Sequence, residues 1–524
     1  MQPDSKRAWI AGASRIALWA VLLLNGAWFA YFAGVTILSP YPIEYREGAP
    51  LVMTRLLLSG ANPFSLENQP LGMNNYGALY NLAVLPFAAV FGNTLLTHRA
   101  VTFVFILLGF GLVFGAVLNS SRDRPLAVVT GAMVAIALAA RAGLGAFPSS
   151  MGASLFLAAI LVPFGRSFDR RGLLLGGLLS LLAFYTKPYF VLAFGILASY
   201  VFLFISKRKA LAFALLFAVG LCASIVLVKS LYPLYFFDTV VSNLSQAARV
   251  EWGHLYVQLE EFFAEFYPVL IAVIIMLVKT SSVTPRLLVV PDLISRSNLV
   301  ALDQPLVSKR PDYFAYCFMC SLLAFILILG PNPGTFMSYA YQLMLPTLVL
   351  WFSCGLKQEH RLGVIFLPVL LLNLLSFSIM ALNPALLAQS DKSRQAWAAL
   401  YRLVDRSGHV LNSPVLAPEM VRLGMWPPDS GHTEYYFRLG GSAENDLLGP
   451  GLEVVKSDGQ DYLESIRAAV TNQEFDRIIV TDRHDYFYDY DLISRYYQQS
   501  ATLSVDMPQA DQKWHLIVWV PNPK

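Results

Sequence analysis

Two glutamates directly after the first long apolar run are the side chains of this chain best placed for acid–base chemistry. Glu44 and Glu47 lie in the segment YPIEYREGAPLVMTRLLL, at a spacing that would put both on one face of a helical turn. A carboxylate can take the proton of an attacking hydroxyl, a role worth about 10² to 10⁴ in rate. Arg46 between them could bind a phosphate or anchor the segment at a membrane interface. This segment is therefore the first candidate for an active site.

Lys187 is the best candidate for binding an anion such as phosphate. It ends an otherwise apolar helix and precedes Pro188, which places its ammonium at the membrane surface. The alternative is a lysine that only snorkels at a helix end. Further polar side chains are predicted to bind substrate, each with an ordinary loop, turn or aromatic-belt role as its alternative: Arg249, His254, Asn75, Tyr76, Tyr339 and Gln342.

The composition identifies the elements that must position these residues as membrane helices. Of all residues 56% are hydrophobic and 14% charged, and apolar stretches of spanning length recur between residues 15 and 382. The net charge of +4 reports topology more than partners, and no nucleic-acid signature is present. The cysteines lie in apolar segments, which argues against disulfides, and Cys317 and Cys320 lack the second pair that a zinc site needs. The sequence thus predicts a polytopic helical membrane protein without a disulfide framework or a cysteine zinc site.

The distribution of lysine and arginine predicts about eleven transmembrane helices. The short segment 77–92 contains Pro86 and is expected to lie in the membrane interface, because only then do most basic clusters face the cytoplasm. Residues 1–382 are then a transmembrane module. Its outer loop 39–98, which carries the acidic motif, faces the same side as Lys187.

Residues 383–524 are expected to form a small soluble α/β domain on the outer surface. Segments with strand character alternate there with segments of helical spacing, which is typical of an α/β layer. The expected strands are 409–418, 476–482, 500–506 and 513–520, and the expected helices are 459–471 and 487–499.

The outer-loop pattern resembles a known superfamily. YPIEYREGAPLVMTRLLLSGANPF, then NNYGALYNL, then an apolar run ending in FG and Arg99, is similar to the first outer loop of GT-C fold glycosyltransferases. These include protein O-mannosyltransferases and the aminoarabinose transferase that acts on lipid A. AFYTKPYF and GTFMSYAYQLMLP are similar, more loosely, to a lysine-bearing turn and a late outer loop of that superfamily. The resemblance covers most of the chain, although each motif is short.

The resemblance implies an inverting glycosyltransferase, multi-pass in the bacterial inner (plasma) membrane, with a periplasmic or extracellular C-terminal domain. The implied donor is a polyprenyl-phosphate-linked sugar, and the acceptor is a hydroxyl of an envelope glycan, a lipid or a protein. Because the leaving group departs as a phosphate anion, one carboxylate base and a cation suffice. Glu47 resembles the family's acidic position more than Glu44, which stays the alternative base. Membrane lipids are the other partners, no cofactor is certain, and a need for a divalent metal stays open.

Two other classes compete with a transferase. A transporter or flippase of lipid-linked sugars would be expected to show internal repeats and helices broken at mid-membrane, and the sequence shows neither. A non-catalytic scaffold of a polysaccharide assembly complex would not need two acids in the outer loop.

Overall fold

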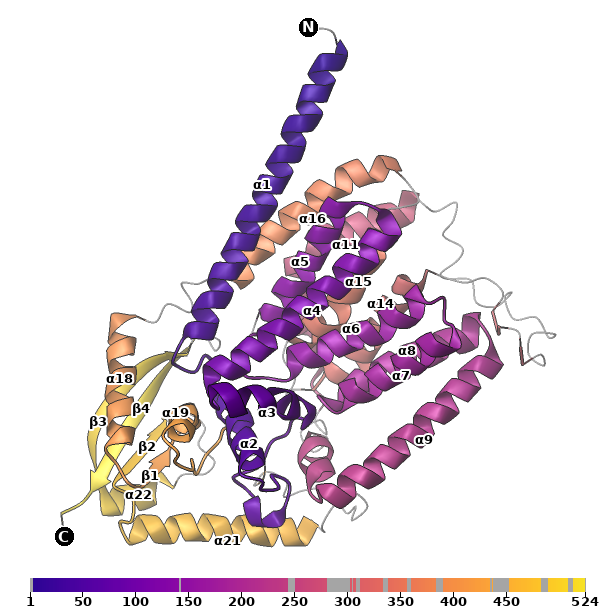
Figure 1. Cartoon of the computed structure of the whole chain (residues 1–524). Coiled ribbons are helices and arrows are strands. Elements are labelled where there is room, and N and C mark those ends of the chain that lie inside the picture. Colours follow the sequence, from indigo (N-terminus) through magenta and orange to yellow (C-terminus); the bar gives the residue numbers. More distant parts are fainter. Residues whose placement is uncertain are drawn as a thin grey trace.

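The computed structural model of the chain describes residues 3–140, 143–243, 250–279, 302–303, 305–307, 312–332, 338–355, 360–382, 390–433, 436, 452–481, 489–507 and 512–523. The described part is mostly helical, with a small sheet formed by residues near the C-terminus (Figure 1). The sheet lies beside the end of the first helix, at one end of the helix bundle.

Apolar helices form the bundle, and short polar side chains fix where several of them begin. At the start of α4, the hydroxyl of Thr94 accepts a hydrogen bond from the amide of Thr97, and Asp123 and Asp169 cap α5 and α7 in the same way. The helices of the bundle are α1 (Pro3–Leu38), α4 (Leu95–Ser121), α5 (Arg124–Ala139), α6 (Ser149–Gly165), α7 (Arg170–Phe184), α8 (Leu192–Phe204), α9 (Lys207–Leu231), α11 (Trp252–Lys279), α14 (Tyr313–Ala324), α15 (Leu345–Gly355) and α16 (His360–Ala381).

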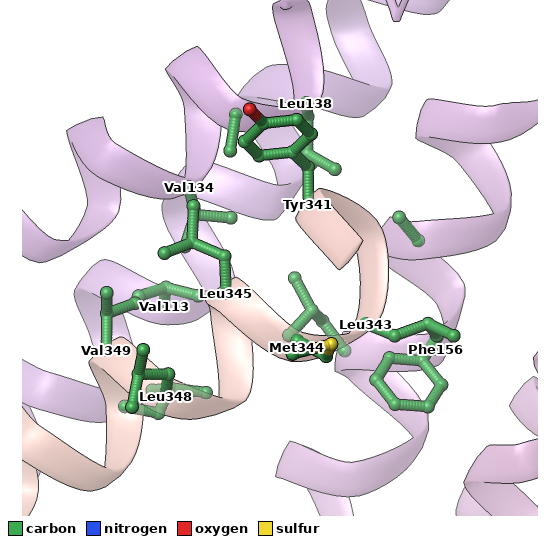
Figure 2. Close-up of a cluster of buried hydrophobic side chains, with 14 of the residues drawn as sticks. Val113, Val134, Leu138, Phe156, Tyr341, Leu343, Met344, Leu345, Leu348 and Val349 are labelled. Carbon is green, nitrogen blue, oxygen red and sulfur yellow. The ribbon is translucent and has the colours of Figure 1, made fainter. Parts of the chain in front are cut away.

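The core of the bundle gathers side chains from helices far apart in the sequence. Figure 2 shows Val113 of α4, Val134 of α5 and Leu345 of α15 in one cluster of buried apolar side chains. All three are fully buried. Because lipid tails are as apolar as these side chains, close packing rather than exclusion of water holds such helices together.

Three helices of the described part are long and apolar enough to cross a membrane, namely Arg15–Leu38, Leu95–Ser121 and Lys207–Leu231. Shorter apolar helices accompany them, at Leu79–Phe91, Arg124–Ala139, Ser149–Gly165, Pro188–Phe204, Tyr313–Leu329, Ala340–Cys354 and Leu367–Ala381. The polytopic helical fold is as predicted. The count of about eleven crossings stays a prediction.

The outer loop after α1 folds into short helices at the bundle end that adjoins the C-terminal domain. They are η1 (Tyr45–Glu47), α2 (Gly48–Leu58), η2 (Leu66–Asn68) and α3 (Leu79–Phe91). Figure 1 shows α2 and α3 together at this end, and Asn81 of α3 donates hydrogen bonds to the Pro50 carbonyl and the Thr54 hydroxyl of α2. That α3 lies in the membrane interface stays a prediction.

The C-terminal α/β domain has a four-stranded sheet in its described residues, with strand order β1-β2-β4-β3. β1 and β2 are parallel, and the other neighbours are antiparallel. Its elements are α18 (Asp391–Asp405), β1 (Val410–Asn412), η9 (Pro414–Leu416), α19 (Ala417–Arg422), α21 (Leu452–Thr471), β2 (Arg477–Thr481), α22 (Tyr490–Tyr496), β3 (Tyr497–Met507) and β4 (Gln512–Pro521).

Two of the segments expected in this domain end earlier than the sequence suggested. The strand expected at 409–418 ends at Asn412, because Pro414 has no amide hydrogen to continue the ladder and begins a helical turn instead. The helix expected at 487–499 ends at Tyr496. Tyr497 then begins β3, where its backbone pairs with Pro521 and its side chain packs beside α21.

Aromatic side chains join the C-terminal domain to the outer loop. The ring of Tyr41 stacks on Trp397 with centroids 5.6 Å apart, and the ring of Tyr45 stacks on Trp514 at 5.7 Å. Arg55 of α2 donates hydrogen bonds to the carbonyl oxygens of two residues that follow α19. The segment that carries the glutamates therefore lies at the contact between the two parts of the molecule.

Candidate active site

Glu47 forms a fully buried ion pair with Arg99 of α4. The Arg99 Nε lies 2.9 Å from Glu47 Oε1, and Nη2 lies 2.7 Å from Oε2. The backbone amides of Ile43 and Ala146 donate to the same carboxylate at 2.8 and 2.9 Å. Each oxygen of Glu47 thus accepts two hydrogen bonds, which fills its acceptor capacity.

The guanidinium of Arg99 is satisfied as fully as the carboxylate. Its remaining N–H groups donate to the carbonyl oxygens of Thr36, Ser39 and Tyr41, so the ion pair fastens the end of α1 and the start of the outer loop to α4. Removing one partner of such a pair leaves a buried charge without compensation, at a cost of about 3–5 kcal/mol. The geometry shows that Glu47 and Arg99 hold these segments together.

Glu44 has a different environment although it lies on the same short segment. The side chain of Arg46 donates from Nε to Oε1 at 2.6 Å, and the Arg46 backbone amide donates to Oε2 at 2.7 Å. Each Glu44 oxygen thus accepts one of these two hydrogen bonds and keeps acceptor capacity. Burial raises the pKa of the Glu44 carboxyl, against the lowering effect of Arg46. A carboxylate with a raised pKa is a stronger base.

Lys187 lies in the turn between α7 and η3 (Pro188–Val191), as the TKP sequence predicted. Its ammonium lies 4.4 Å from the centre of the Tyr76 ring and 5.7 Å from that of Tyr339, and none of the ion pairs in the described part includes it. Burial and, to a smaller extent, the charge of Arg46 lower the pKa of Lys187 to about 7, while the charge of Glu44 opposes the shift. A buried cation held by aromatic rings is suited to an anionic ligand.

A glycine joins the Lys187 turn to the outer loop. The amide of Gly77 donates to the carbonyl of Thr186 at 2.9 Å, and a Cβ at Gly77 would lie 1.9 Å from the carbonyl oxygen of Tyr185. Only glycine permits this approach. The NNYG sequence therefore places Tyr76 directly beside Lys187.

The asparagines of this sequence are both buried. The Asn74 Oδ1 accepts a hydrogen bond from the Tyr76 amide at 3.1 Å, a turn of the Asx type. Asn243 donates to the backbone carbonyl of Asn75, while the side-chain carbonyl oxygen of Asn75 is buried without a hydrogen-bond partner in the described structure. A buried oxygen of this kind is a candidate for a substrate hydroxyl.

Tyr339 and Gln342 reach the same site from the region of η7 (Ala340–Met344). The Tyr189 hydroxyl donates to the Gln342 side-chain oxygen at 2.6 Å, and the Tyr189 ring meets the Tyr339 ring at a centroid distance of 4.7 Å. Gln342 therefore binds Tyr189, whose ring packs on Tyr339 beside Lys187. Its link to the Lys187 ammonium passes through these two rings.

Most of the site residues predicted from the sequence thus lie in one connected cluster. It comprises Glu44, Arg46, Lys187, Asn75, Tyr76, Tyr339 and Gln342. His254 lies in the first turn of α11 and is half-buried, and it is not among the side chains described around Lys187. Arg249 lies outside the described residues.

Sequence reasoning missed His432, which the C-terminal domain contributes to this cluster. Its imidazole is fully buried, with Nδ1 3.1 Å from the Asn74 Oδ1 and the ring edge-to-face with Tyr76 at 4.7 Å. The preceding PPDSG sequence indicates a turn. No local signal could show that this turn reaches the outer loop.

No three histidine, cysteine or carboxylate side chains gather into a possible metal site in the described part of the chain. Glu44 and Glu47 each pair with an arginine instead. These described residues therefore provide no set of three such side chains for a divalent metal.

The fold defines a structural class: a helical protein of the GT-C fold with a small C-terminal α/β domain. In particular, the chain is similar to ArnT from Cupriavidus metallidurans in the apo state, with a TM-score of 0.50 and 12% identity over 98% of this chain and 100% of that one. The structure of ArnT bound to undecaprenyl phosphate is matched over the same shares at 12% identity, with a TM-score of 0.49. The fold expected from the outer-loop motifs is confirmed.

Comparisons at the level of sequence add nothing to this likeness. No protein-family model matches the chain. No curated protein sequence matches it either.

Proposed function

We propose that this chain is an inverting glycosyltransferase that moves a sugar from a polyprenyl-phosphate-linked donor to a hydroxyl of an envelope glycan, lipid or protein. The reaction would take place on the outer side of the bacterial inner membrane, where the C-terminal domain would also lie. One observation carries the proposal: Glu44, a buried carboxylate with a raised pKa, is clustered with the cations of Arg46 and Lys187. Such a cluster suits the transfer of a sugar whose leaving group is a phosphate.

The proposed reaction is a single displacement at the anomeric carbon. The acceptor oxygen forms a bond to that carbon, its proton passes to Glu44, and the bond between the carbon and the phosphate oxygen breaks. The electron pair of the broken bond stays on the phosphate, whose charge rises. Preformed cations stabilise charge that develops in the transition state without further reorganisation.

Glu44 is the proposed base, although the sequence favoured Glu47. Both oxygens of Glu47 are filled by Arg99 and two backbone amides, so a substrate hydroxyl could approach it only by breaking a buried ion pair. Glu44 keeps acceptor capacity. Its link to Arg46 also ties the proposed base to one of the proposed phosphate-binding cations.

Lys187 and Arg46 are the proposed partners of the donor phosphate. The ammonium of Lys187 lies against the rings of Tyr76 and Tyr339, and the Arg46 guanidinium carbon lies 5.9 Å from the centre of the Phe147 ring. Aromatic faces hold a cation while leaving its charge available to an anion. Asn75, whose side-chain oxygen is buried in this region, is the proposed contact to a sugar hydroxyl.

The experiment is a transfer assay with the full-length protein in lipid nanodiscs. A panel of radiolabelled polyprenyl-phosphate sugars is offered together with an extract of envelope lipids and glycans, and the label is followed into the acceptor. We expect transfer by the wild type and loss of at least about 100-fold in Glu44→Gln, since an amide cannot accept the proton. Glu67→Gln, which changes an exposed acid of the same outer loop, is the matched control and keeps wild-type transfer.

The competing classes give different results. A flippase would move the labelled lipid between leaflets of a vesicle without breaking its phosphate–sugar bond. A scaffold would do neither. Transfer that is equally fast in Glu44→Gln and the wild type would overturn the proposed role of Glu44.

A further inference from the structure

A turn of the C-terminal domain is built to a fixed shape before it meets the outer loop. The amide of Gly431 donates to the Asp429 side chain at 2.8 Å, and the amide of Ser430 donates to the Thr433 hydroxyl at 3.0 Å. At the end of β1, the Asn412 side chain bonds both the amide and the carbonyl of Asp429. The turn 429–433 is therefore a rigid extension of the sheet.

Two glycines let this turn approach the segment of the glutamates closely. A Cβ at Gly431, whose φ is +94°, would lie 2.7 Å from the Tyr45 carbonyl oxygen and 3.0 Å from the Arg46 Cα. A Cβ at Gly48 would lie 2.8 Å from the Ser430 carbonyl oxygen. Side chains at either position would force the two parts of the molecule apart, so the sequence is built for contact between them at the site.

His432, at the tip of this turn, is one aromatic ring away from the Lys187 ammonium. The Asn74 Oδ1 already accepts a hydrogen bond from the Tyr76 amide, so in its contact with His432 it is again the acceptor and the imidazole Nδ1 is assigned the proton. The imidazole packs on Tyr76 at 4.7 Å, and the Tyr76 ring in turn packs on the Lys187 ammonium at 4.4 Å.

We propose that His432 is a positioning residue of the active site: through Asn74 and Tyr76 it fixes the ring that holds the Lys187 ammonium, and it closes that side of the site to water. The C-terminal domain then contributes a positioning residue to the donor-phosphate site. This proposal rests on the proposed function, because it assigns His432 a task in binding the donor phosphate.

The charges around Lys187 agree with this task. Arg46 and Glu44 face it from the outer loop, Tyr76 and Tyr339 are its aromatic neighbours, and His432 faces it from the C-terminal domain. Burial, with the charges of Arg46 and Lys187, lowers the pKa of His432 well below its ordinary value. A neutral imidazole can close the site without adding a third positive charge beside the two cations.

The sign of the expected pH effect follows from the same groups. Lys187 must be protonated to attract phosphate, so donor affinity falls as pH rises through its pKa of about 7. If the imidazole is removed, water enters, desolvation of Lys187 weakens and its pKa rises toward the ordinary value. The loss of affinity at high pH should then begin at a higher pH in the variant than in the wild type.

The test measures binding of undecaprenyl phosphate to the full-length protein in nanodiscs between pH 6 and pH 10. In His432→Ala we expect a dissociation constant raised about tenfold at neutral pH, the size of a lost buried hydrogen bond. The alkaline limb, which is the fall in affinity at high pH, should move up by about one pH unit. His432→Asn, whose amide can still donate to Asn74, should recover part of both effects. His515→Asn, which changes a half-buried histidine bonded to Ser504 in the same domain, should match the wild type.

The pH limb separates positioning from a merely structural loss, because a misfolded fraction lowers the amount of binding without moving its pH dependence. If His432→Ala does not fold, the milder His432→Asn still gives the limb. Both variants binding as the wild type does across the whole pH range would overturn the inference while leaving the transfer assay unaffected. A wild type that binds no undecaprenyl phosphate would overturn both this inference and the proposed donor class.

Discussion

The two glutamates of the outer loop show how three residues of separation can change a carboxylate's role. Glu47 is enclosed by Arg99 and two amides, while Glu44 has one arginine and a raised pKa. From the sequence the two acids were close to equivalent, because the partners that distinguish them come from distant parts of the chain. Burial and hydrogen-bond saturation, rather than residue type, decide which acid can exchange a proton.

Substitutions of the two acids should therefore differ in their effects on transfer and on stability. Glu44→Gln should lose transfer at a smaller cost in stability, because the Arg46 side chain keeps some access to solvent. Glu47→Gln should lose about 3–5 kcal/mol of stability, because Arg99 keeps its charge in a fully buried site. Thermal unfolding and transfer are measured on both, with Glu67→Gln as the exposed control. A stable but inactive Glu47→Gln beside an active Glu44→Gln would return the base to Glu47.

Lys187 gives a prediction about charge. Lys187→Met should weaken binding of undecaprenyl phosphate and abolish the alkaline limb near pH 7, because the titrating group is gone. Lys187→Arg should bind in part and show no such limb, since a guanidinium stays charged throughout. Lys229→Met changes a lysine in the last turn of the apolar helix α9 and should bind as the wild type does. Equal binding by Lys187→Met and the wild type would leave Lys187 a snorkelling anchor.

At the scale of elements, sequence patterns predicted what depends on local composition. The apolar segments, the Lys187 turn and the strands at 476–482 and 513–520 correspond to elements of the structure. The site depends instead on pairs that local patterns cannot show: Glu47 with Arg99, 52 residues apart, and Asn74 with His432, 358 residues apart. Strand 409–418 was overextended because its apolar residues outweighed the prolines that end it.

The glycine that joins two elements at the site can be tested directly. Gly77→Ala places a Cβ against the backbone carbonyl of Tyr185, so the turn must shift and the Gly77–Thr186 hydrogen bond is lost. We expect a loss of about 1–3 kcal/mol in stability and weaker binding of undecaprenyl phosphate, because Tyr76 moves with the turn. Gly111→Ala is the matched control, since a Cβ there has no neighbour within 4 Å. Unchanged unfolding and binding in Gly77→Ala would mean that this close approach is dispensable.

At the scale of the whole molecule, the C-terminal domain packs against the candidate site. Tyr41 and Tyr45 stack on its tryptophans, and its turn 429–433 packs on the backbone of the glutamate segment. The sequence predicted the domain and its α/β class from its own strands and helices. The sequence could not predict the contact between the domain and the outer loop. The aromatic and glycine residues that form this contact have no distinctive local pattern in either segment.

This contact constrains the membrane topology, since residues that touch must face the same side. Single cysteines at Ser59 in the outer loop and Asp461 in α21, introduced into a cysteine-free chain, should react with a membrane-impermeant maleimide added from outside. A cysteine at Arg170, in a basic cluster predicted to be cytoplasmic, should react only after the membrane is permeabilised. Ser59, Asp461 and Arg170 are all exposed, so access to the reagent depends on the side of the membrane. Outside labelling of Arg170 would overturn the orientation. Labelling of Ser59 and Asp461 from different sides of the membrane would mean that His432 and Glu44 cannot lie together, and this would contradict the proposed site.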